Sequence, residues 1–470
     1  MKVLLIVPDG VAVRNYLYSS FIPELEKLGA EVILYHQISD KAIEEVKLIQ
    51  KKVKLIRQIP FFIESPRARL LRESTVYARL LLNKRLMQNA TIMDFWNNKS
   101  GGYKKKVLFL ISELIGALAS RSYKAILKLE SLYEKDILKH KIINKVEKDL
   151  KDLKPDFVLN LHQRAPVSSP IISMASKLKI KTGTVIFSWD NVPKARLISR
   201  YDKYFVWSKL MKEELELLYP EIDKNNIEIV GTPQFEFYFQ HNLIKEKEVF
   251  YAEHGLDPNR RTICFSANDS TSPYEANYLE DLASEVGKIN EKERPQILFR
   301  KCPVDKSDRF DKILEKYSEY IVSVQPDWKL GSKDSTSFTT IYPSYNDMQL
   351  LVNTVKHSDG VINFGSTMAH DFAAYDKPCL YINYDPIYNS IYKVSKVYDF
   401  QHFKSFLGMD ATGWINKKSE FVPKIMQLLE DPAQVGKDKR EWMEKIVQYP
   451  LQENSKNLAE KIYSLCTSVS

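Results

Sequence analysis

The fold is decided by residues 359–378, which read DGVINFGSTMAHDFAAYDKP. Residues 360–363 predict a short buried strand, and Gly365, Ser366 and Thr367 then predict a turn that leads into a helix. A Lys-Pro pair at 377–378 precedes a further apolar run. A strand, a turn and a helix in this order are typical of a doubly wound α/β sheet, and the amides that open such a helix favour an anion.

The residues of this turn suit a phosphate group. Gly365 lets the backbone approach closely, while Ser366 and Thr367 can cap the helix or donate to phosphate oxygens. Asp371 lies one turn into the predicted helix, where it can accept hydrogen bonds from ribose hydroxyls. A second interpretation stays open, in which Ser366 only caps a core helix and Asp371 is solvated.

The same alternation of apolar runs and helical patterns extends on both sides of this stretch. The runs lack polar alternation, which is typical of parallel strands covered on both faces. They are residues 2–7, 31–35, 156–161, 184–188, 203–207 and 227–230 in the first half, and residues 262–266, 296–300, 320–324 and 379–382 in the second. A chain of 470 residues is long enough for two such domains of about 200 residues each.

The changes of pattern along the chain predict the domain organisation. We expect an N-terminal Rossmann-like domain at 1–240 and a second Rossmann-like domain at 255–437, joined by a charged linker within 239–259. A helical insertion at about 61–150 interrupts the first domain. A closing helix at 438–470 is expected to pack back on the first domain.

Positive charge is concentrated in the insertion. The chain carries a formal net charge of +9, and residues 61–125 alone contain twelve Lys or Arg against four Asp or Glu. We interpret this segment as a helical surface that faces an anionic membrane. A solvated helical face is the alternative, and nucleic acid is not favoured because no known nucleic-acid-binding fold accompanies the charge. The basic residues are Arg67, Arg69, Arg72, Arg79, Lys84, Arg85, Lys104, Lys105 and Lys106.

The remaining composition bears on the compartment. The four cysteines are scattered and lack zinc-ligand spacing, which indicates a reducing environment. The first apolar run ends in Pro8-Asp9 and is too short for a signal peptide, and the longest apolar stretch, 107–119, is shorter than the roughly 20 residues of a membrane span. We expect a cytoplasmic protein, either free or peripheral at the inner face of the plasma membrane.

The 359–378 stretch resembles the donor-binding motif of GT-B glycosyltransferases, a superfamily that includes UDP-glycosyltransferases and glycogen phosphorylase. It is also similar to a motif of the related non-hydrolysing sugar-nucleotide epimerases. The resemblance rests on a strand, Gly-Ser-Thr, and a helix with an acidic residue six positions before Lys-Pro. It implies that Gly365, Ser366 and Thr367 contact the donor phosphates. Asp371 would hold the ribose, where the family usually has Glu.

A second resemblance covers part of the first half. Residues 187–192, Phe-Ser-Trp-Asp-Asn-Val, together with 201–208 and 229–235, look like the N-terminal domain of glycosyltransferases of bacterial surface-polysaccharide biosynthesis. The two resemblances imply an α/β protein with two Rossmann-like doubly wound domains in the GT-B arrangement. The domains would face each other across a cleft that holds an activated sugar, and the basic helical insertion would belong to the N-terminal domain.

Two side chains are candidates for the general base that an inverting transfer needs. Asp190 follows a strand of the first sheet, where ligand sites of open α/β folds gather, and a carboxylate there can take a proton. His162 follows the preceding predicted strand and is the rival base. The competing interpretations are an Asp190 that caps the next turn and a His162 that is a partly buried, hydrogen-bonded core residue.

Four further residues are candidate ligands of the donor. Arg300 and Lys301 follow the strand residues 296–299, and in the related transferases a basic residue at this place faces the donor diphosphate. Cys302 stands where many relatives have His, and a solvated Arg300 is the alternative. Gly10 and Arg14 lie in the loop after the first strand, where they can approach the acceptor or the donor phosphates.

These observations predict a metal-independent glycosyltransferase that uses no cofactor, because the chain contains no Asp-x-Asp pair and no zinc motif. It would move a sugar from a nucleotide-activated donor to a lipid-linked or polysaccharide acceptor. The alternatives are a sugar-nucleotide epimerase or a CDP-polyol phosphotransferase of the same fold, and a non-catalytic glycan- or membrane-binding protein.

Overall fold

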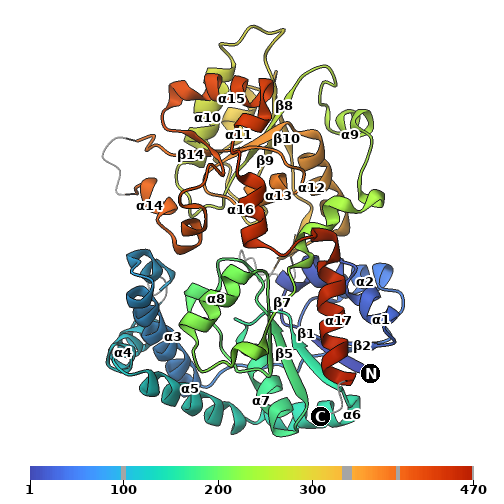
Figure 1. The fold of residues 1–470 in the computed structure, drawn as a ribbon, viewed down its shortest axis with the longest axis vertical. Coiled ribbons are helices and arrows are strands. Elements are labelled where there is room, and N and C mark those ends of the chain that lie inside the picture. Colours follow the sequence, from blue (N-terminus) through green and yellow to red (C-terminus); the bar gives the residue numbers. More distant parts are fainter. Residues whose placement is uncertain (97–101, 331–340, 388–391, 468–470) are drawn as a thin grey trace. The chain divides into compact units, whose positions relative to one another are not determined.

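The computed structural model describes residues 1–96, 102–330, 341–387 and 392–467 (Figure 1). The chain divides into two compact units. Unit 1 comprises Met1–Pro233, Phe400–His402 and Ile446–Ser470, and unit 2 comprises Gln234–Asp399 and Phe403–Lys445. The segment 239–259, which was expected to be an interdomain linker, belongs to unit 2 instead. Helix α9 (Lys247–His254) lies in it and buries Phe250 in a cluster with Leu298 and Val324 of unit 2.

Unit 1 is built on a seven-stranded parallel sheet with the strand order β3-β2-β1-β4-β5-β6-β7. Its interior strand β1 has the sequence KVLLIV, and Val3 to Val7 are all fully buried. Such a continuous apolar run requires cover on both faces of the sheet. The strands are β1 (Lys2–Val7), β2 (Glu31–His36), β3 (Leu55–Gln58), β4 (Phe157–Asn160), β5 (Lys181–Val185), β6 (Lys203–Val206) and β7 (Ile227–Ile229).

Helices cover this sheet and several begin at a serine cap. Ser39, Ser65 and Ser208 each accept a hydrogen bond from a backbone amide of the first turn, which fixes the start of α2, α3 and α8. The helices of unit 1 are α1 (Phe21–Lys27), α2 (Asp40–Ile49), α3 (Pro66–Leu86), α4 (Tyr103–Ala119), α5 (Tyr123–Leu138), α6 (Ile142–Leu153), α7 (Ser169–Lys177), α8 (Lys209–Leu218) and α17 (Asn454–Thr467).

Helix α17 returns to unit 1 from the end of the described chain and packs against α1. It buries Leu458, Ala459 and Ile462, and the side-chain amide of Asn454 donates to the carbonyl of Thr232 at 3.2 Å. The core of unit 1 is therefore completed by residues distant in sequence from its sheet.

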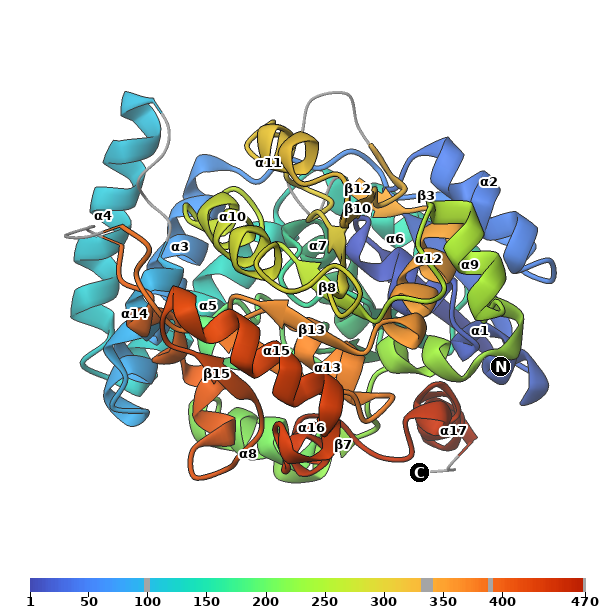
Figure 2. The same ribbon diagram turned by 90° about the horizontal axis from the view of Figure 1, so that it is seen from above.

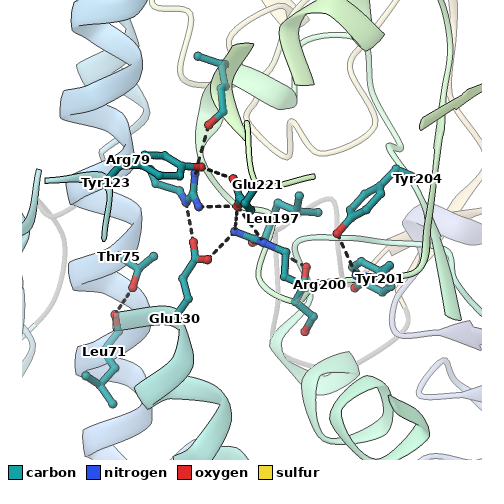
Figure 3. Close-up of polar contacts among 12 residues, drawn as sticks. Leu71, Thr75, Arg79, Tyr123, Glu130, Leu197, Arg200, Tyr201, Tyr204 and Glu221 are labelled. Atoms are coloured by element: carbon teal, nitrogen blue, oxygen red, sulfur yellow. Dashed lines mark hydrogen bonds and ion pairs between the residues drawn. The ribbon is translucent and has the colours of Figure 1, made fainter. Parts of the chain in front are cut away.

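The basic insertion forms helices α3, α4 and α5, which lie together at one edge of unit 1 (Figures 1 and 2). Figure 3 shows that Arg79 of α3 points inward into a network of charged groups. Its Nε donates to Glu130 of α5 at 2.6 Å and its Nη2 to Glu221 at 2.9 Å, and Arg200 pairs with the same two carboxylates. This network neutralises Arg79, which is 1% exposed.

Arg72 of α3 is also turned inward, where it pairs with Glu64 at 2.7 Å and Glu73 at 2.6 Å. Arg72 and Arg79 therefore do not form part of the outward basic surface that the sequence predicts, because carboxylates of the same unit pair with both. Arg67, Arg69, Lys84, Arg85, Lys104 and Lys106 are exposed, and Lys105 is half-buried.

Unit 2 is built on a six-stranded sheet with the order β10-β9-β8-β13-β14-β15, again parallel throughout. Its strands are β8 (Thr262–Ser266), β9 (Gln296–Arg300), β10 (Ile321–Val324), β13 (Gly360–Asn363), β14 (Cys379–Ile382) and β15 (Gly413–Ile415). A separate antiparallel pair is formed by β11 (Trp328–Leu330) and β12 (Ile341–Pro343). Both large sheets thus have the doubly wound order.

The helices of unit 2 pack on the two faces of this sheet. Besides α9 they are α10 (Glu275–Val286), α11 (Asp311–Lys316), α12 (Tyr345–His357), α13 (Met368–Ala373), α14 (Ser395–Tyr398), α15 (Phe421–Glu430) and α16 (Lys439–Ile446). Across both units, the described residues contain no helix with the length and apolar character to cross a membrane.

Candidate functional site

Each doubly wound sheet has one point where the strand order reverses, and ligands of open α/β folds bind beyond the carboxyl ends of the strands at that point. In unit 1 this switch point lies between β1 and β4, because β2 and β5 are their outer neighbours. In unit 2 it lies between β8 and β13. The side chains after these four strands are therefore the first candidates for chemistry.

At the switch point of unit 1, the structure joins Asp9, which follows β1, to His162, which follows β4. His162 Nδ1 and Asp9 Oδ2 are 2.6 Å apart, and the other carboxylate oxygen of Asp9 accepts from the amide of Val11 at 3.1 Å. A carboxylate can only accept hydrogen bonds, so the pair places the imidazole proton on Nδ1. Nε2 of the neutral ring is then left as a proton acceptor.

The ring of His162 is held in place from other sides as well. Its backbone exchanges two hydrogen bonds with the side chain of Asn160, and its ring packs edge-on against Phe187 with centroids 4.5 Å apart. Among the described residues, none hydrogen bonds to Nε2. A fixed imidazole oriented by a carboxylate is the arrangement of a general base, so His162 is placed better for that role than a solvent-exposed histidine.

Asp190, the other candidate base, lies in a different environment. Its carboxylate accepts from Ser188 Oγ at 2.7 Å, from the side-chain amide of Asn191 at 2.8 Å and from Lys194 Nζ. Burial alone would raise the pKa of Asp190, but the Lys194 ammonium, the His402 ring and these hydrogen bonds hold it well below its usual value. A carboxylate so stabilised takes up a proton poorly, so the structure argues against Asp190 as the base.

The loop residues Gly10 and Arg14 are also engaged internally. Gly10 is buried and its carbonyl accepts from the amide of Val13 at 3.2 Å. Arg14 lies in a turn of π-helix at Val13–Leu17, and its Nε donates to Asn15 Oδ1 at 2.9 Å. The loop does place Asp9 beside His162, so its main contribution to the site comes from Asp9, a residue for which the sequence predicted no role.

At the switch point of unit 2, the turn after β13 keeps part of its predicted anion-binding capacity. Gly365 has a φ of +60°, which permits the sharp turn, and Ser366 is half-buried while Thr367 is exposed. Asn363 Oδ1 already accepts from the amide of Ser366 at 2.8 Å, and Ser366 Oγ accepts from the amide of Met368 at 3.3 Å. Among the described residues, nothing accepts from the amides of Gly365 and Thr367, so these two and the two hydroxyls can serve a phosphate.

Asp371 is enclosed within unit 2, and its assignment to a ribose stays a prediction. It is 4% exposed, and its Oδ1 accepts from the hydroxyl of Tyr238 in the same unit at 2.7 Å. The reason is that all six residues of α13 are buried, so its acidic side chain is enclosed by protein. A ribose hydroxyl that binds Oδ1 would compete with the Tyr238 hydroxyl.

The two cations at the end of β9 each have a partner inside unit 2, although Nη1 of Arg300 is buried without a hydrogen bond to any described residue. Arg300 is 6% exposed, and its Nη2 donates to both oxygens of Asp347, at 3.1 and 3.0 Å. Lys301 Nζ donates to the carbonyl of Ser307. The predicted contact with a diphosphate is thereby weakened, because the Arg300 charge is balanced by a buried carboxylate.

The loop after β8 supplies site residues that sequence reasoning missed. Asn268 donates from its side-chain amide to the carbonyl of Phe364, which joins this loop to the turn after β13. Arg309 holds the loop by donating to the carbonyls of Asn268 and Asp269 at 3.0 and 3.1 Å. Asn268 could have been found from topology, since its loop follows β8, which borders the switch point.

Glu275 is a buried carboxylic acid beside the same loop. It is fully buried, its Oε1 accepts from Ser272 Oγ at 3.1 Å, and no described residue hydrogen bonds to its Oε2. Burial raises the pKa of Glu275 to about 7. Perturbed acids of this kind gather at functional sites, although buried structural groups show the same shift.

Hollows elsewhere on the units do not coincide with these points. One hollow, of about 360 Å³, is lined by Gly29 to Val32 and neighbouring charged residues. It lies at the amino end of β2, whereas the switch point lies at the carboxyl ends of the strands. Another, of about 330 Å³, lies between α9 and α12.

In the described part of the chain, no group of three or more His, Cys, Asp or Glu side chains could hold a metal ion. The metal-independent reaction stays a prediction.

No family model matches the sequence, and no curated protein matches it. Solved structures are similar in fold. The UDP-GlcNAc 2-epimerase of Methanocaldococcus jannaschii superposes with a TM-score of 0.54 at 13% identity, covering 98% of this chain and 99% of that one. The UDP-GlcNAc 2-epimerase of Neisseria meningitidis bound to UDP-GlcNAc gives 0.51 at 12%, covering 98% and 99%.

A glycosyltransferase of Rickettsia africae is similar to the same degree, with a TM-score of 0.53 at 12% identity over the whole of this chain and 99% of that one. At these identities the likeness shows the fold alone. The predicted fold class, two doubly wound α/β domains of the GT-B kind with a helical insertion in the first, is confirmed.

Proposed function

We propose that the protein is an enzyme of nucleotide-activated sugars in which His162, oriented by Asp9, acts as the base. The observation that carries the proposal is the 2.6 Å pair at the switch point of unit 1, a histidine whose second nitrogen is left to take a proton. The turn at Gly365 to Thr367 would bind the nucleotide phosphates through two amides and two hydroxyls.

Two reactions use such a base. Epimerisation of a sugar carbon requires that a proton be removed and returned, and glycosyl transfer requires that a proton be taken from the acceptor hydroxyl. Several of the similar solved structures are UDP-GlcNAc 2-epimerases, which favours epimerisation of a UDP-sugar as the first reaction to test. The Ser-Trp-Asp-Asn motif at 188–191 and the similar Rickettsia structure favour transfer to a lipid-linked or polysaccharide acceptor as the second.

One assay separates these reactions. The protein is incubated with UDP-GlcNAc in D2O without an acceptor, and the sugar is followed by proton NMR. An epimerase forms the C2 epimer with deuterium at C2, whereas a transferase leaves the donor unchanged until an acceptor is added and then releases UDP. The Asp9→Asn variant should be slowed in whichever reaction is found.

A binding screen covers the choice of nucleotide. Thermal unfolding is measured with UDP, CDP, GDP, their sugars and a CDP-polyol, since a ligand at 100 times its dissociation constant adds about 2.7 kcal/mol to the free energy of unfolding. A stabilising CDP-polyol would point to the phosphotransferase alternative. If no nucleotide stabilises the protein and no donor is turned over, the enzyme proposal fails.

A further inference from the structure

Helix α4 of unit 1 has its apolar residues on the outside. An amphipathic surface helix normally buries its large apolar residues against the core. Here the buried face of α4 consists mainly of Ser112, Gly116 and Ala119, whereas Leu114 and Leu118 on the other face are 62% and 64% exposed. The apolar surface of this helix therefore faces away from its own unit.

The exposed residues form one continuous stripe. At about 100° per residue, Leu110, Ile111, Leu114 and Leu118 fall within about 100° of arc, and Tyr103 at the start of the helix falls within the same arc. Their exposed fractions range from 40% for Ile111 to 82% for Tyr103. The stripe runs for about 22 Å along the helix.

The inner face of α4 is fixed, so the stripe cannot rotate into the core. A Cβ added at Gly116 would lie 2.7 Å from the carbonyl oxygen of Ser74 on α3, which shows how closely the two helices approach. Phe109 packs edge-on against Trp96 at 5.2 Å, and Glu113 accepts from the indole Nε1 of Trp96 at 2.8 Å. Figures 1 and 2 both show α4 at the outer edge of unit 1 with α3 on its inner side.

The charges around the stripe have one sign. Between residues 61 and 125, the described part of the chain exposes eight cations and one acid, Asp94. Lys104 and Lys106 lie at the start of the stripe, and Arg121 and Lys124 follow directly after its end. The remaining exposed cations are Arg67, Arg69, Lys84 and Arg85. The other acids of this segment are turned inward or paired, as Glu64 and Glu73 are with Arg72.

We propose that α4 lies in the interface of an anionic lipid membrane, with the stripe from Tyr103 to Leu118 in the boundary between headgroups and acyl chains. Basic residues at both ends would contact the lipid phosphates, and Tyr103 would sit at headgroup depth, where aromatic residues with a polar tip are favoured. The small residues of the inner face let α4 pack closely on α3 while its leucines stay free for lipid. This surface is independent of the proposed chemistry.

Two other partners fit these observations less well. A second copy of the chain would bring two basic surfaces together, which charge repulsion opposes. A nucleic acid would satisfy the cations but would leave the leucines without an apolar partner. An anionic membrane satisfies both the charge and the apolar stripe.

Cosedimentation of the full chain with lipid vesicles tests this proposal. We expect binding to vesicles of 70% phosphatidylcholine and 30% phosphatidylglycerol and much weaker binding to pure phosphatidylcholine. The variant L110S/L114S/L118S should bind at least a hundredfold more weakly, since each inserted leucine contributes about a factor of ten. The variant K104Q/K106Q should bind about tenfold more weakly, and added salt should have the same direction of effect.

Matched controls use exposed residues of the same kind elsewhere in unit 1. Leu48→Ser, at a leucine 73% exposed on α2, and K51Q/K52Q should leave vesicle binding unchanged. All variants are compared by circular dichroism, and K104Q/K106Q keeps the test valid if the leucine variant does not fold. The proposal is overturned if the wild-type chain ignores anionic vesicles, if it binds duplex DNA instead, or if the leucine variant only converts a dimer to a monomer in sedimentation.

Discussion

The two switch points of this protein occupy equivalent places in two sheets of the same strand order, yet they present different chemistry. In unit 1, a histidine and an aspartate from neighbouring strands pair with each other, and one ring nitrogen is left to accept a proton. In unit 2, the charged side chains near the switch point are matched by internal partners, as Arg300 is by Asp347. There the amides and hydroxyls of a glycine turn are left for a ligand.

This difference teaches how a duplicated architecture can divide its tasks. A charged side chain that ends in an internal pair contributes stability and little recognition, whereas an oriented side chain with one unused atom is prepared for chemistry. We therefore expect substitutions at the first switch point to affect turnover and substitutions at the second to affect binding or stability.

Replacement of His162 by Ala should give the largest effect. Loss of a general base lowers turnover by about 10² to 10⁴, while the affinity for UDP should change less than twofold because the ring is assigned no phosphate contact. Turnover of the UDP-sugar accepted by the wild-type enzyme and UDP calorimetry measure the two quantities. Asp9→Asn should lower turnover about a hundredfold by freeing the imidazole tautomer. Equal losses in turnover and UDP affinity would contradict the assignment of catalysis to the first switch point and of binding to the second.

Arg300→Met should chiefly destabilise unit 2. Removing the cation leaves the buried Asp347 carboxylate uncompensated, so the free energy of unfolding should fall by about 3 to 5 kcal/mol in urea denaturation. The double variant R300M/D347N should recover much of this loss. The UDP affinity at temperatures where the variant is folded should change little. A tenfold loss of UDP affinity with unchanged stability would instead indicate that Arg300 contacts the donor diphosphate.

Gly365→Ala should weaken nucleotide binding about tenfold. Its φ of +60° costs any other residue about 1 to 2 kcal/mol, and the added Cβ would lie 3.1 Å from Val397 Cγ1, so the turn must shift. Gly408→Ala is the matched control, because Gly408 has a φ of +80° and open space around its Cβ position. Both variants should lose stability, but only the first should lose UDP affinity in calorimetry. The turn has no role in binding if the two variants behave alike.

Glu275→Gln should change the pH dependence of stability. The folded chain holds this proton up to about pH 7, whereas the unfolded chain releases it near the ordinary glutamate value of 4.5, so wild-type stability falls as pH rises between these values. The variant should lack this fall, a difference of about 2 kcal/mol between pH 5 and pH 8 in thermal unfolding. Glu280→Gln, at a partly exposed position of the same helix, is the control. Parallel pH profiles for wild type and E275Q would show that Glu275 is ionised in the folded protein.

The sequence predicts the buried strands well because they are continuous apolar runs, and β8 and β9 begin and end at the predicted residues. It does not predict β3, whose sequence LIRQ is short, half polar and at the sheet edge, nor β15 at the edge of the other sheet. Edge strands are covered less, so selection for apolar residues is weaker there.

The site was predicted less completely, because its pairs join distant parts of the chain. Asp9 and His162 are 153 residues apart, and Tyr238 and Asp371 are 133 apart, so no local pattern reveals either contact. The first pair was nonetheless accessible in principle, since both residues follow strands that the doubly wound order makes neighbours. The second depends on how α13 is packed, which the spacing of its residues does not determine.

The return of α17 to unit 1 has a consequence for how the protein folds during its synthesis. The ribosome must make all of unit 2 between Pro233 and Ile446 before α17 exists to cover α1. At ordinary rates of elongation this interval lasts roughly 10 to 40 s. During that time unit 1 lacks one helix. The nascent chain depends on chaperones or on partly formed structure until α17 has been synthesised.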